Sequence, residues 1–388
     1  MNNFEFYCPT KVIFGKGTIA KLSDLISEII NKDKKVLMIY GGGSIKKNGV
    51  YEQVKSALKK FNMVEFSGIE PNPTYETCMQ AVEVIKNENI DFLLAVGGGS
   101  TLDATKFIAA AAKYEGEEPY DLVSKEAECK EAMPFGDVIT LPATGSEMNC
   151  GAVISRKSTK EKLAIHSPLL YPKFSIIDPE TTYSLPINQV RNGIVDTFVH
   201  VMELYATYDV NTPLQDAWAL GLIKTLIQEA PKVIKNNSDY DAKANIFWCA
   251  TCGLNFWLAL GVIQDWSTHR IGHELTAFYG LAHGESLAVI MPRLWTVRKK
   301  EKAQKLSKIA REVFGCSEVD DLKAANCAIE KTEEFFNSIG MKTKLSDYGV
   351  NPTEAAQKIK ERFEQRKTLL GEDLKVTPSM VSKILSKC

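Results

Sequence analysis

DFLLAVGGGSTLDATKFIAAAAK, residues 91–113, joins an apolar β-rich run to a glycine turn and then to a helical pattern. Continuous apolar runs of this kind are typical of parallel strands that are buried on both faces. The same order occurs earlier, where VLMIY at 36–40 leads through GGGS into a helical pattern at 49–61. Strand, glycine turn and helix, repeated along the chain, predict an α/β domain with a parallel sheet.

The predicted secondary structure changes near residue 186, from alternating strands and helices to helices alone. Before it, further strands are predicted at 63–66, 138–141 and 174–178, and a helix at 74–88. After it, apolar residues recur at helical spacing and β-rich runs are almost absent. We therefore expect an α/β domain over residues 1–185 and an all-helical domain over residues 186–388.

The composition argues against a nucleic-acid partner. The chain has 388 residues, of which 45% are hydrophobic, and its formal net charge is -1. No overall basic field is present to attract a polyanion. One dense basic run, RKKEKAQK at 298–305, contains Glu301 and is interpreted as a solvated helix face.

The cysteines and the N-terminus indicate a cytoplasmic protein. Only Cys249 and Cys252 form a CxxC pair, and no second pair exists to complete a zinc site, so we expect reduced thiols. The first residues, MNNFEFYCPTKVIFG, lack a charged-then-apolar signal pattern. The apolar runs are interrupted before they reach the length of a membrane span. A soluble, cytoplasmic protein without a membrane partner is the resulting expectation.

Two glycine turns are candidates for a dinucleotide site. Each lies between a strand and a helix, where glycine lets the backbone approach a ligand and the helix N-terminus attracts a phosphate. Neither matches G-x-G-x-x-G, because Lys46 and Leu102 occupy the last position, and tight strand-to-helix packing explains a single such turn equally well. The candidate residues are Gly41, Gly42, Gly43 and Ser44 in the first turn and Gly97, Gly98, Gly99 and Ser100 in the second.

Polar residues near these turns bear on the cofactor. Enzymes that use NAD usually place an acid near a strand end to hold the adenosine ribose. The segment Gly41–Ser44 offers no carboxylate, and Lys46 and Lys47 follow it, which favours NADP(H) over NAD(H). A later cluster at 141–149, LPATGSEMN, could cap a helix or contact a ligand, and from the residues alone capping is favoured.

Four of the five histidines fall between residues 200 and 283. Asp196 and His200 are four apart on a predicted helix, as are His269 and His273 on another, so each pair shares a helix face. Gly280 is expected to end the second helix and to let His283 turn back towards the same centre. Each histidine could be satisfied separately by hydrogen bonds, but several buried imidazoles beside a carboxylate suit a divalent metal.

Spacing alone leaves the metal ligands open. Five residues compete for about four positions, and helical spacing favours the pair His269 and His273. HRIGH is not the zincin motif, because Arg270 stands where that motif requires glutamate, so peptide hydrolysis is disfavoured.

Taken together, these residues resemble the iron-containing (group III) alcohol dehydrogenase family over essentially the whole chain. The branch that they resemble most contains butanol dehydrogenases and broad-range NADPH-dependent aldehyde reductases. The segments that carry the resemblance are EPNPTYET (70–77), AVGGGSTLDATK (95–106), LPATGSEMN (141–149), NGIVDTFVH (192–200) and HRIGHELTAFYGLAHG (269–284).

The resemblance implies a dehydroquinate synthase-like architecture, with one metal in the cleft between a dinucleotide-binding domain and a helical domain. It implies that Fe2+, or alternatively Zn2+, is bound by Asp196, His200, His269 and His283, and that His273 lies close by without being a ligand. It also implies that the pyrophosphate binds at Gly97, Gly98 and Ser100 and that Asp103 belongs to the same fingerprint. The residues implied to line the nicotinamide half are Thr140, Thr144, Ser146, Asn149, Lys162 and Leu185.

The expected activity is hydride transfer between a nicotinamide and a short or medium primary alcohol or aldehyde, such as butanol or butanal. His273 is expected to relay the proton and Lys162 to hydrogen-bond the cofactor ribose. An apolar wall is expected on the helical segment that faces the metal, and a homodimer through FEFYCPTKVIF (4–14) follows from the resemblance. The expected wall residues are Phe256, Trp257, Leu258, Leu260 and Trp266.

Two alternatives belong to other classes. A dehydroquinate synthase-like lyase would need several Lys and Arg residues for a polyanionic substrate, whereas NFWLALGVIQDW (255–266) is apolar. A non-enzymatic metal or nucleotide sensor would bind the same groups without turnover, and an NADPH absorbance assay with butanal separates it from an enzyme.

Overall fold

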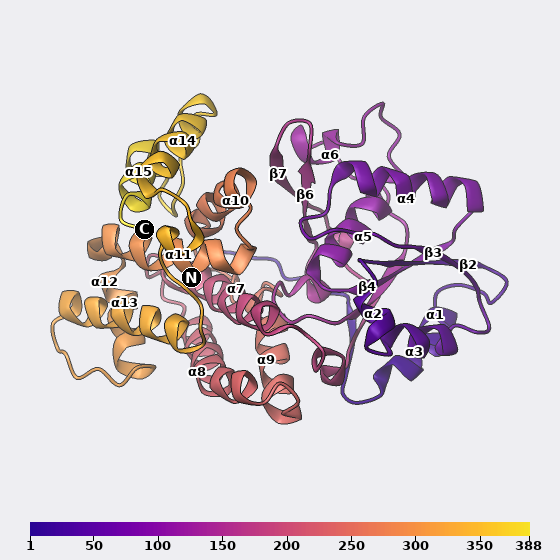
Figure 1. Ribbon diagram of the computed structural model, residues 1–388, viewed down its shortest axis with the longest axis horizontal. Helices are drawn as coiled ribbons and strands as arrows, with labels where there is room; N and C mark the ends of the chain where they lie inside the picture. The colour runs from indigo at the N-terminus through magenta and orange to yellow at the C-terminus, as the bar shows by residue number, and fades with distance from the viewer. The chain divides into compact units, whose positions relative to one another are not determined.

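The computed structural model describes residues 1–388, and the chain divides into two compact units (Figure 1). The α/β unit contains Tyr7–Leu185 and Asn237–Phe247. The helical unit contains Met1–Phe6, Pro186–Asn236 and Trp248–Cys388. The predicted fold class, a parallel α/β sheet followed by an all-helical region, is confirmed.

The α/β unit is built on a six-stranded parallel sheet with the order β1-β8-β5-β4-β2-β3. Its strands are β1 Lys11–Phe14, β2 Lys35–Tyr40, β3 Asn62–Phe66, β4 Phe92–Gly97, β5 Phe135–Ile139 and β8 Phe174–Ile177. A second sheet, which the sequence patterns did not predict, is the antiparallel hairpin of β6 Gly151–Arg156 and β7 Glu161–His166. Its mixed polar and apolar residues hide the strand signal, because only one of its faces is buried.

Alternation along the central strands creates two separate cores. Leu37 and Leu93 face the core that includes α4 and α5, whereas Val36 and Leu94 face the core that includes α1 and α3. Helices therefore cover both faces of the sheet, as Figure 1 shows. The helices of this unit are η1 Thr18–Lys21, α1 Leu22–Ser27, α2 Ser44–Lys47, α3 Val50–Ala57, α4 Tyr75–Glu88, α5 Gly99–Ala111, α6 Asp121–Ser124, η2 Ser146–Met148, η3 Pro168–Leu170 and η4 Pro179–Thr182.

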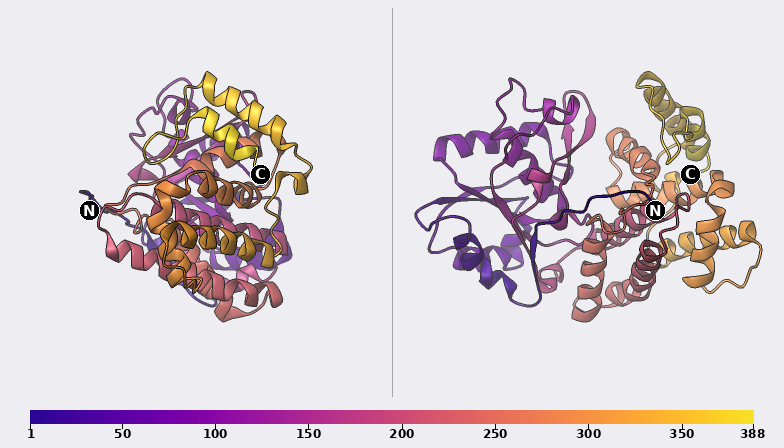
Figure 2. Two further views of the ribbon diagram at one scale, coloured as in Figure 1. Left: turned by 90° about the vertical axis from the view of Figure 1, so that its left-hand side faces the viewer. Right: turned by 180° about the vertical axis from the view of Figure 1, so that it is seen from behind.

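The helical unit carries both ends of the chain (Figure 2). Its first residues are held by residues much later in the sequence, because the Asn2 N–H donates to the Gly261 carbonyl oxygen at 3.0 Å. No helix is long and apolar enough to cross a membrane. The later helices are α7 Ile187–Tyr205, α8 Pro213–Lys235, α9 Tyr240–Gly253, α10 Ser267–Tyr279, α11 His283–Val297, α12 Lys299–Glu312, α13 Asp321–Ser338, η5 Leu345–Tyr348, α14 Pro352–Gln365 and α15 Pro378–Leu385. Helix α9 belongs to the α/β unit as far as Phe247 and to the helical unit from Trp248.

The interpretation of RKKEKAQK as a solvated face is wrong for three of its residues. Arg298, which precedes α12, and Lys302 and Lys305 on its inward side are buried at i, i+4 and i+7. Lys302 forms ion pairs of 2.9 Å with both Asp265 and Glu372. The carboxylates that offset the cost of burying these charges lie far away in the sequence. The residues of the basic run alone therefore could not predict its burial.

The segment NFWLALG is not helical, contrary to the sequence interpretation. Helix α9 ends at Gly253, and no further helix begins before Ser267. The Trp257 N–H donates to the Asn255 side-chain oxygen at 3.1 Å, and Phe256 has a left-handed φ of 70°. The Asn255 side chain thus replaces a helical hydrogen bond, which explains why the apolar spacing alone was misleading.

Candidate active site

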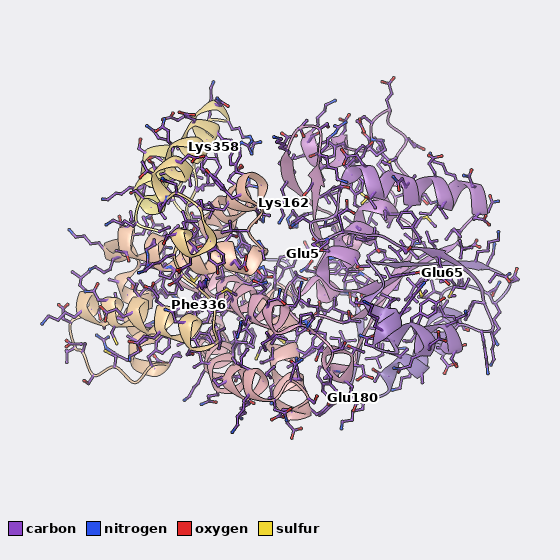
Figure 3. All side chains as sticks on the ribbon, viewed as in Figure 1. Glu5, Glu65, Lys162, Glu180, Phe336 and Lys358 are labelled. Atoms are coloured by element: carbon purple, nitrogen blue, oxygen red, sulfur yellow. The ribbon has the colours of Figure 1, made fainter.

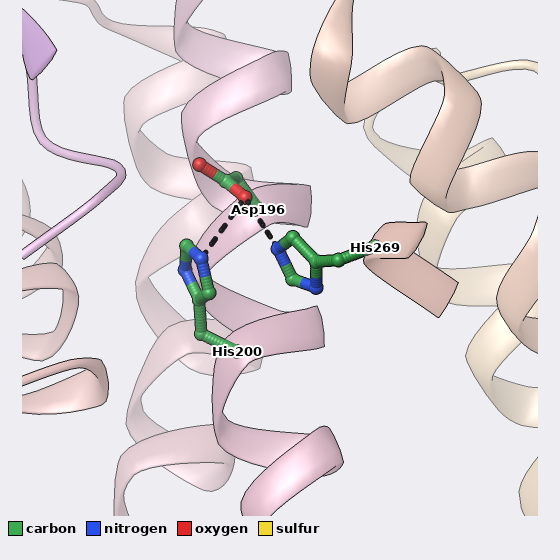
Figure 4. A group of neighbouring side chains, drawn as sticks. All are labelled: Asp196, His200 and His269. Carbon is green, nitrogen blue, oxygen red and sulfur yellow. Dashed lines mark ion pairs between the residues drawn. The ribbon is translucent and has the colours of Figure 1, made fainter. Parts of the chain in front are cut away.

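Four predicted residues of the helical unit converge on one point. Asp196 and His200 lie on α7, His269 on α10 and His283 at the start of α11. Asp196 Oδ1 is 3.5 Å from His200 Nε2, 3.5 Å from His269 Nε2 and 3.4 Å from His283 Nε2. Figure 4 shows the first two of these contacts. Candidate ligand atoms of Asp196, His200 and His269 all lie within 4.8 Å of one another.

These separations fit a bound divalent ion. Two ligands in tetrahedral coordination, each about 2.1 Å from the ion, lie roughly 3.4 Å apart. Asp196 Oδ1 and His269 Nε2 are buried and make no hydrogen bond, which is costly unless another group satisfies them. Burial opposes ionisation of Asp196, but the imidazoles of His200, His283 and His269 hold its pKa well below its ordinary value. The carboxylate is therefore an anion, as a metal ligand must be.

Two glycines allow the three helices to approach closely enough. A Cβ at Gly272 of α10 would lie 2.8 Å from Ser286 Oγ of α11. A Cβ at Gly284 of α11 would lie 2.6 Å from the Asn192 carbonyl oxygen of α7. Gly280, in the left-handed conformation with φ 72°, ends α10 and lets His283 begin the next helix, as expected.

His273 lies beside this cluster. Its ring centroid is 6.3 Å from that of His269 and 5.4 Å from that of His283. The ring of His269 is closer to that of His200, with centroids 4.6 Å apart and the planes nearly parallel. The structure thus brings His269 together with His200 and Asp196, and places His273 at the edge of the cluster.

Glu203 is a residue of this site that the sequence analysis missed. It is buried on α7, its Oε2 contacts His269 Nδ1, and its Oε1 accepts a hydrogen bond of 2.6 Å from the Thr268 N–H. A proton held on His269 Nδ1 leaves the Nε2 lone pair directed at Asp196 and its neighbours. The signal was present, because Asp196, His200 and Glu203 follow one another at i, i+4 and i+7.

Of the expected wall residues, the structure packs Trp266 against the histidines. Its ring centroid lies 5.4 Å from that of His269 and 6.3 Å from that of His200, both edge-on. Trp257 instead contacts Phe6, with centroids 6.5 Å apart, and Leu258 is a buried core residue. The structure therefore places Trp266 beside the histidines, Leu258 in the core and Trp257, which is 37% exposed, at the surface.

In the α/β unit, the second glycine turn leaves no room for side chains. A Cβ at Gly97 would lie 2.4 Å from Thr101 Oγ1, and one at Gly99 would lie 2.6 Å from Thr144 Oγ1. Ser100 stands in the first turn of α5, which no side chain caps. The uncapped N-terminus of this helix offers N–H groups to an anion.

Three predicted cofactor residues form one buried network with Lys106. The Lys106 ammonium donates to Ser146 Oγ at 2.8 Å and to Asn149 Oδ1 at 3.0 Å. Asp103 accepts from the Ser146 hydroxyl at 2.9 Å and from the Val153 N–H at 3.1 Å. Burial lowers the pKa of Lys106 to about 8 and raises that of Asp103. The network fixes the turn at 144–149 beside the glycine turn.

The other predicted cofactor residues lie in the same unit. The Thr140 N–H donates to the Gly97 carbonyl oxygen at 2.9 Å, just beyond β5. Lys162, labelled in Figure 3, lies on β7 and donates to Asn72 Oδ1 at 2.8 Å. Asn72 belongs to the EPNPTYET motif and has a left-handed φ of 56°. At the last position, the Leu185 carbonyl oxygen accepts from Asn237 Nδ2 at 3.0 Å.

The first glycine turn has a carboxylate near it that the sequence argument did not include. Glu65 of β3, labelled in Figure 3, accepts hydrogen bonds from the Tyr40 hydroxyl at 2.8 Å and the Tyr51 hydroxyl at 2.6 Å. Partial burial raises the pKa of Glu65, but these two hydrogen bonds and the charges of Lys46 and Lys55 together lower it below its ordinary value. Lys46 Nζ lies 4.8 Å from the Tyr51 ring centroid. The turn is therefore flanked by both charges, because β3 pairs with β2.

The fold and this arrangement of residues agree with comparisons to known proteins. The model of the iron-containing alcohol dehydrogenases matches residues 9–179, and the C-terminal model of the Fe-containing alcohol dehydrogenase family matches residues 191–387. The chain belongs to the iron-containing alcohol dehydrogenase family, as the sequence resemblance predicted. It is therefore an oxidoreductase that works with a metal and a nicotinamide cofactor, and the lyase and sensor alternatives are not favoured.

Relatives that are named for an activity match almost the whole chain. The NADPH-dependent aldehyde reductase YqhD of Escherichia coli is 47% identical over 386 residues, which are 99% of each protein. A probable NADH-dependent butanol dehydrogenase 1 of Bacillus subtilis is 42% identical over 90% of this chain and 91% of its own. The crystal structure of the E. coli protein has a TM-score of 0.96 at 46% identity, covering 100% of this chain and 98% of its own.

Proposed function

We propose that this chain is an alcohol dehydrogenase and aldehyde reductase for short and medium primary alcohols and aldehydes such as butanol and butanal. The observation that carries the proposal is the convergence of three imidazole Nε2 atoms on the Asp196 carboxylate. The test is NADPH absorbance with butanal, using protein loaded with Fe2+ and, separately, with Zn2+. Oxidation of NADPH that depends on both butanal and metal supports the proposal. If neither the Fe2+-loaded nor the Zn2+-loaded protein oxidises NADPH with butanal, the proposal is wrong.

Asp196, His200, His269 and His283 would hold Fe2+, or alternatively Zn2+. A bound ion supplies Lewis-acid polarisation of the substrate oxygen. Glu203 keeps His269 in the tautomer that leaves Nε2 free to bind, and Trp266 excludes water from the side of His200 and His269. Membership of the iron-containing alcohol dehydrogenase family supports iron as the bound metal.

The cofactor is held by residues of the α/β unit. Gly97, Gly98, Gly99 and Ser100 bind the pyrophosphate at the start of α5, and Gly41 to Ser44 receive the adenosine end. Lys162 hydrogen-bonds the ribose, and Asn72 positions the Lys162 ammonium for this. The nicotinamide half lies against Thr140, Thr144, Ser146, Asn149 and Leu185. Asp103 positions Ser146 by accepting a hydrogen bond from its hydroxyl.

The proton is relayed by His273. An imidazole can both donate and accept a proton, and the His273 ring centroid lies 5.4 Å from that of His283. A residue beside the ligands, rather than among them, can give up and regain a proton while the metal stays bound.

NADP(H) is favoured over NAD(H), because Lys46 and Lys47 follow the first glycine turn. Gly42→Asp is expected to shift the kcat/KM ratio towards NADH, since a new carboxylate repels the 2′-phosphate. Gly42 is the better position for this change, because a Cβ there meets nothing within 4 Å, whereas one at Gly41 would lie 3.1 Å from the Ile69 carbonyl oxygen.

Kinetics with both cofactors, for wild type, Gly42→Asp and Gly41→Asp, provide the measurement, and Gly42→Ala is the control for added bulk. Glu65→Gln should increase the preference for NADPH by removing the neighbouring carboxylate. A wild-type enzyme that prefers NADH would contradict the cofactor assignment.

Glu203→Gln is expected to weaken metal binding by about 10- to 100-fold, because a neutral amide orients and polarises His269 less effectively. The metal dissociation constant, measured by competition with a chelator, tests this without any activity assay. Glu334→Gln, on the exposed face of α13, is the matched control and should leave the constant unchanged. Equal metal affinity in Glu203→Gln and wild type would show that Glu203 does not support the site.

Two organisational proposals complete the function. Cofactor binding belongs to residues 1–185 and metal and substrate binding to residues 186–388. The enzyme is a homodimer formed through the N-terminal segment 4–14, where β1 lies at an edge of the sheet. Phe4, Phe6 and Tyr7 are exposed in the single chain, at 51%, 42% and 59%, which supports an interface there. Sedimentation of the intact protein measures the oligomeric state.

A further inference from the structure

A second polar site lies within the helical unit. A cavity of about 240 Å³ opens between the start of α7, the start of α11 and the segment that follows α13. It is lined by Arg191 and Asn192 of α7, Glu285 of α11, and Gly340, Lys342 and Tyr348. None of these residues was assigned to metal, cofactor or substrate.

Two polar atoms of this cavity are buried without a hydrogen-bond partner. They are Arg191 Nε, a donor, and Asn192 Oδ1, an acceptor. Gly340, with a left-handed φ of 80°, makes room for the arginine, since a Cβ there would lie 2.7 Å from Arg191 Nη2. Orphaned donors and acceptors in one cavity are costly, and a bound ligand removes that cost.

The remaining lining groups define the chemistry of such a ligand. Lys342 adds a second cation near Arg191, and its ammonium donates only to the Asp347 carbonyl oxygen at 3.4 Å. Glu285 adds a second acceptor near Asn192, and one of its carboxylate oxygens accepts from the Ala282 N–H at 2.9 Å. The site therefore offers cationic donors for an oxyanion and, beside them, acceptors for a hydroxyl hydrogen.

We propose that this cavity binds a phosphate group that carries an O–H, either free hydrogen phosphate or a small phosphomonoester. The phosphate oxygens accept from the Arg191 guanidinium and the Lys342 ammonium, and the hydroxyl donates to Asn192 Oδ1 or to Glu285. Sulfate has no such hydroxyl at neutral pH, so the same site discriminates against it.

The position of the cavity gives its occupancy a consequence. Asn192 lies one helical turn before Asp196 on α7, and Glu285 lies two residues after His283 on α11. A ligand there contacts the same two helices that carry these candidate metal ligands. Occupancy and metal binding are therefore placed to affect each other, and such coupling is reciprocal.

The experiment is calorimetric titration of the intact, metal-loaded protein, saturated with NADP+, with inorganic phosphate, sulfate and glycerol 3-phosphate. Wild type should bind phosphate at least about tenfold more tightly than sulfate, from loss of a charge-assisted hydrogen bond. Arg191→Met and Lys342→Met should each weaken phosphate binding, the first by at least about tenfold. Lys344→Met, an exposed lysine two residues from Lys342, is the matched control and should bind as wild type does.

Each outcome decides the proposal. Equal phosphate affinity in wild type, Arg191→Met and Lys342→Met would place the phosphate at the metal or nucleotide site and overturn it, as would no binding at all. If Arg191→Met fails to fold, the exposed Lys342→Met still gives the decision. Tighter binding of glycerol 3-phosphate than of phosphate identifies a phosphomonoester as the ligand, and equal or weaker binding identifies free phosphate.

Discussion

His269→Ala is expected to lose the bound metal and, with it, roughly a thousandfold or more in kcat/KM for butanal. The change removes one of four converging donors and also leaves the buried Glu203 Oε2 without its contact to His269 Nδ1. Lewis-acid polarisation supplies several kcal/mol of transition-state stabilisation, and each 1.4 kcal/mol corresponds to about a tenfold rate change.

His273→Ala is the informative comparison, because spacing along the helix pairs His273 with His269. It should retain a full equivalent of metal and lose rate through slower proton transfer, typically by about 10²- to 10⁴-fold. Element analysis of both purified variants gives the answer directly. If His273→Ala loses its metal while His269→Ala keeps it, the ligand assignment is wrong.

Butanal should be a far better substrate than succinic semialdehyde, by at least about a hundredfold in kcat/KM. An apolar wall gains about 0.8 kcal/mol for each buried methylene, so rates should also rise from acetaldehyde to butanal. A substrate carboxylate would have to shed water at a cost well above that gain unless a cation received it. Steady-state rates at one NADPH concentration measure both comparisons.

The cations packed against α10 allow a sharper control. Arg362 of α14 and Arg366, just after the end of this helix, are already paired with Glu274, at 2.7 Å and 3.0 Å. Lys358 of α14 lies over the Phe278 ring, 4.5 Å from its centroid, and no ion pair to a carboxylate is observed for it. Equal or better rates with succinic semialdehyde would overturn the apolar-aldehyde assignment, and Lys358→Met would then show whether this lysine is the anchor.

Much of the site could be predicted because its residues are close in sequence or repeat at a helical period. Asp196 and His200 are four residues apart on one helix. Gly280 predicted the end of α10 and the turn that brings His283 back towards them. The parallel sheet was equally readable, since strands buried on both faces are continuously apolar.

The rest depended on contacts between residues far apart in the chain. Glu65 reaches the first glycine turn because β3 pairs with β2, and Lys302 is buried because Asp265 and Glu372 receive its charge. The sequence around Glu65 and around Lys302 is typical of a solvated surface. Only their contacts with residues far apart in the sequence show that these two side chains lie at a turn and in the interior. Glu203 differs, because its helical spacing to His200 was visible and only the contact with His269 gives it a role.

The membership of the two units also constrains the order in which the chain can complete them as it leaves the ribosome. Residues 1–6 are synthesised long before Gly261, yet they belong with the helical unit, where the Asn2 N–H donates to the Gly261 carbonyl oxygen. Residues 237–247 emerge late, yet they belong with the α/β unit, where Lys243 donates to the Thr182 carbonyl oxygen at 3.3 Å. During synthesis the α/β unit therefore stays incomplete until residues 237–247 are made, and residues 1–6 stay without their partner until Gly261 is made. A cut at residue 185 would leave each half without a segment that belongs to its own unit.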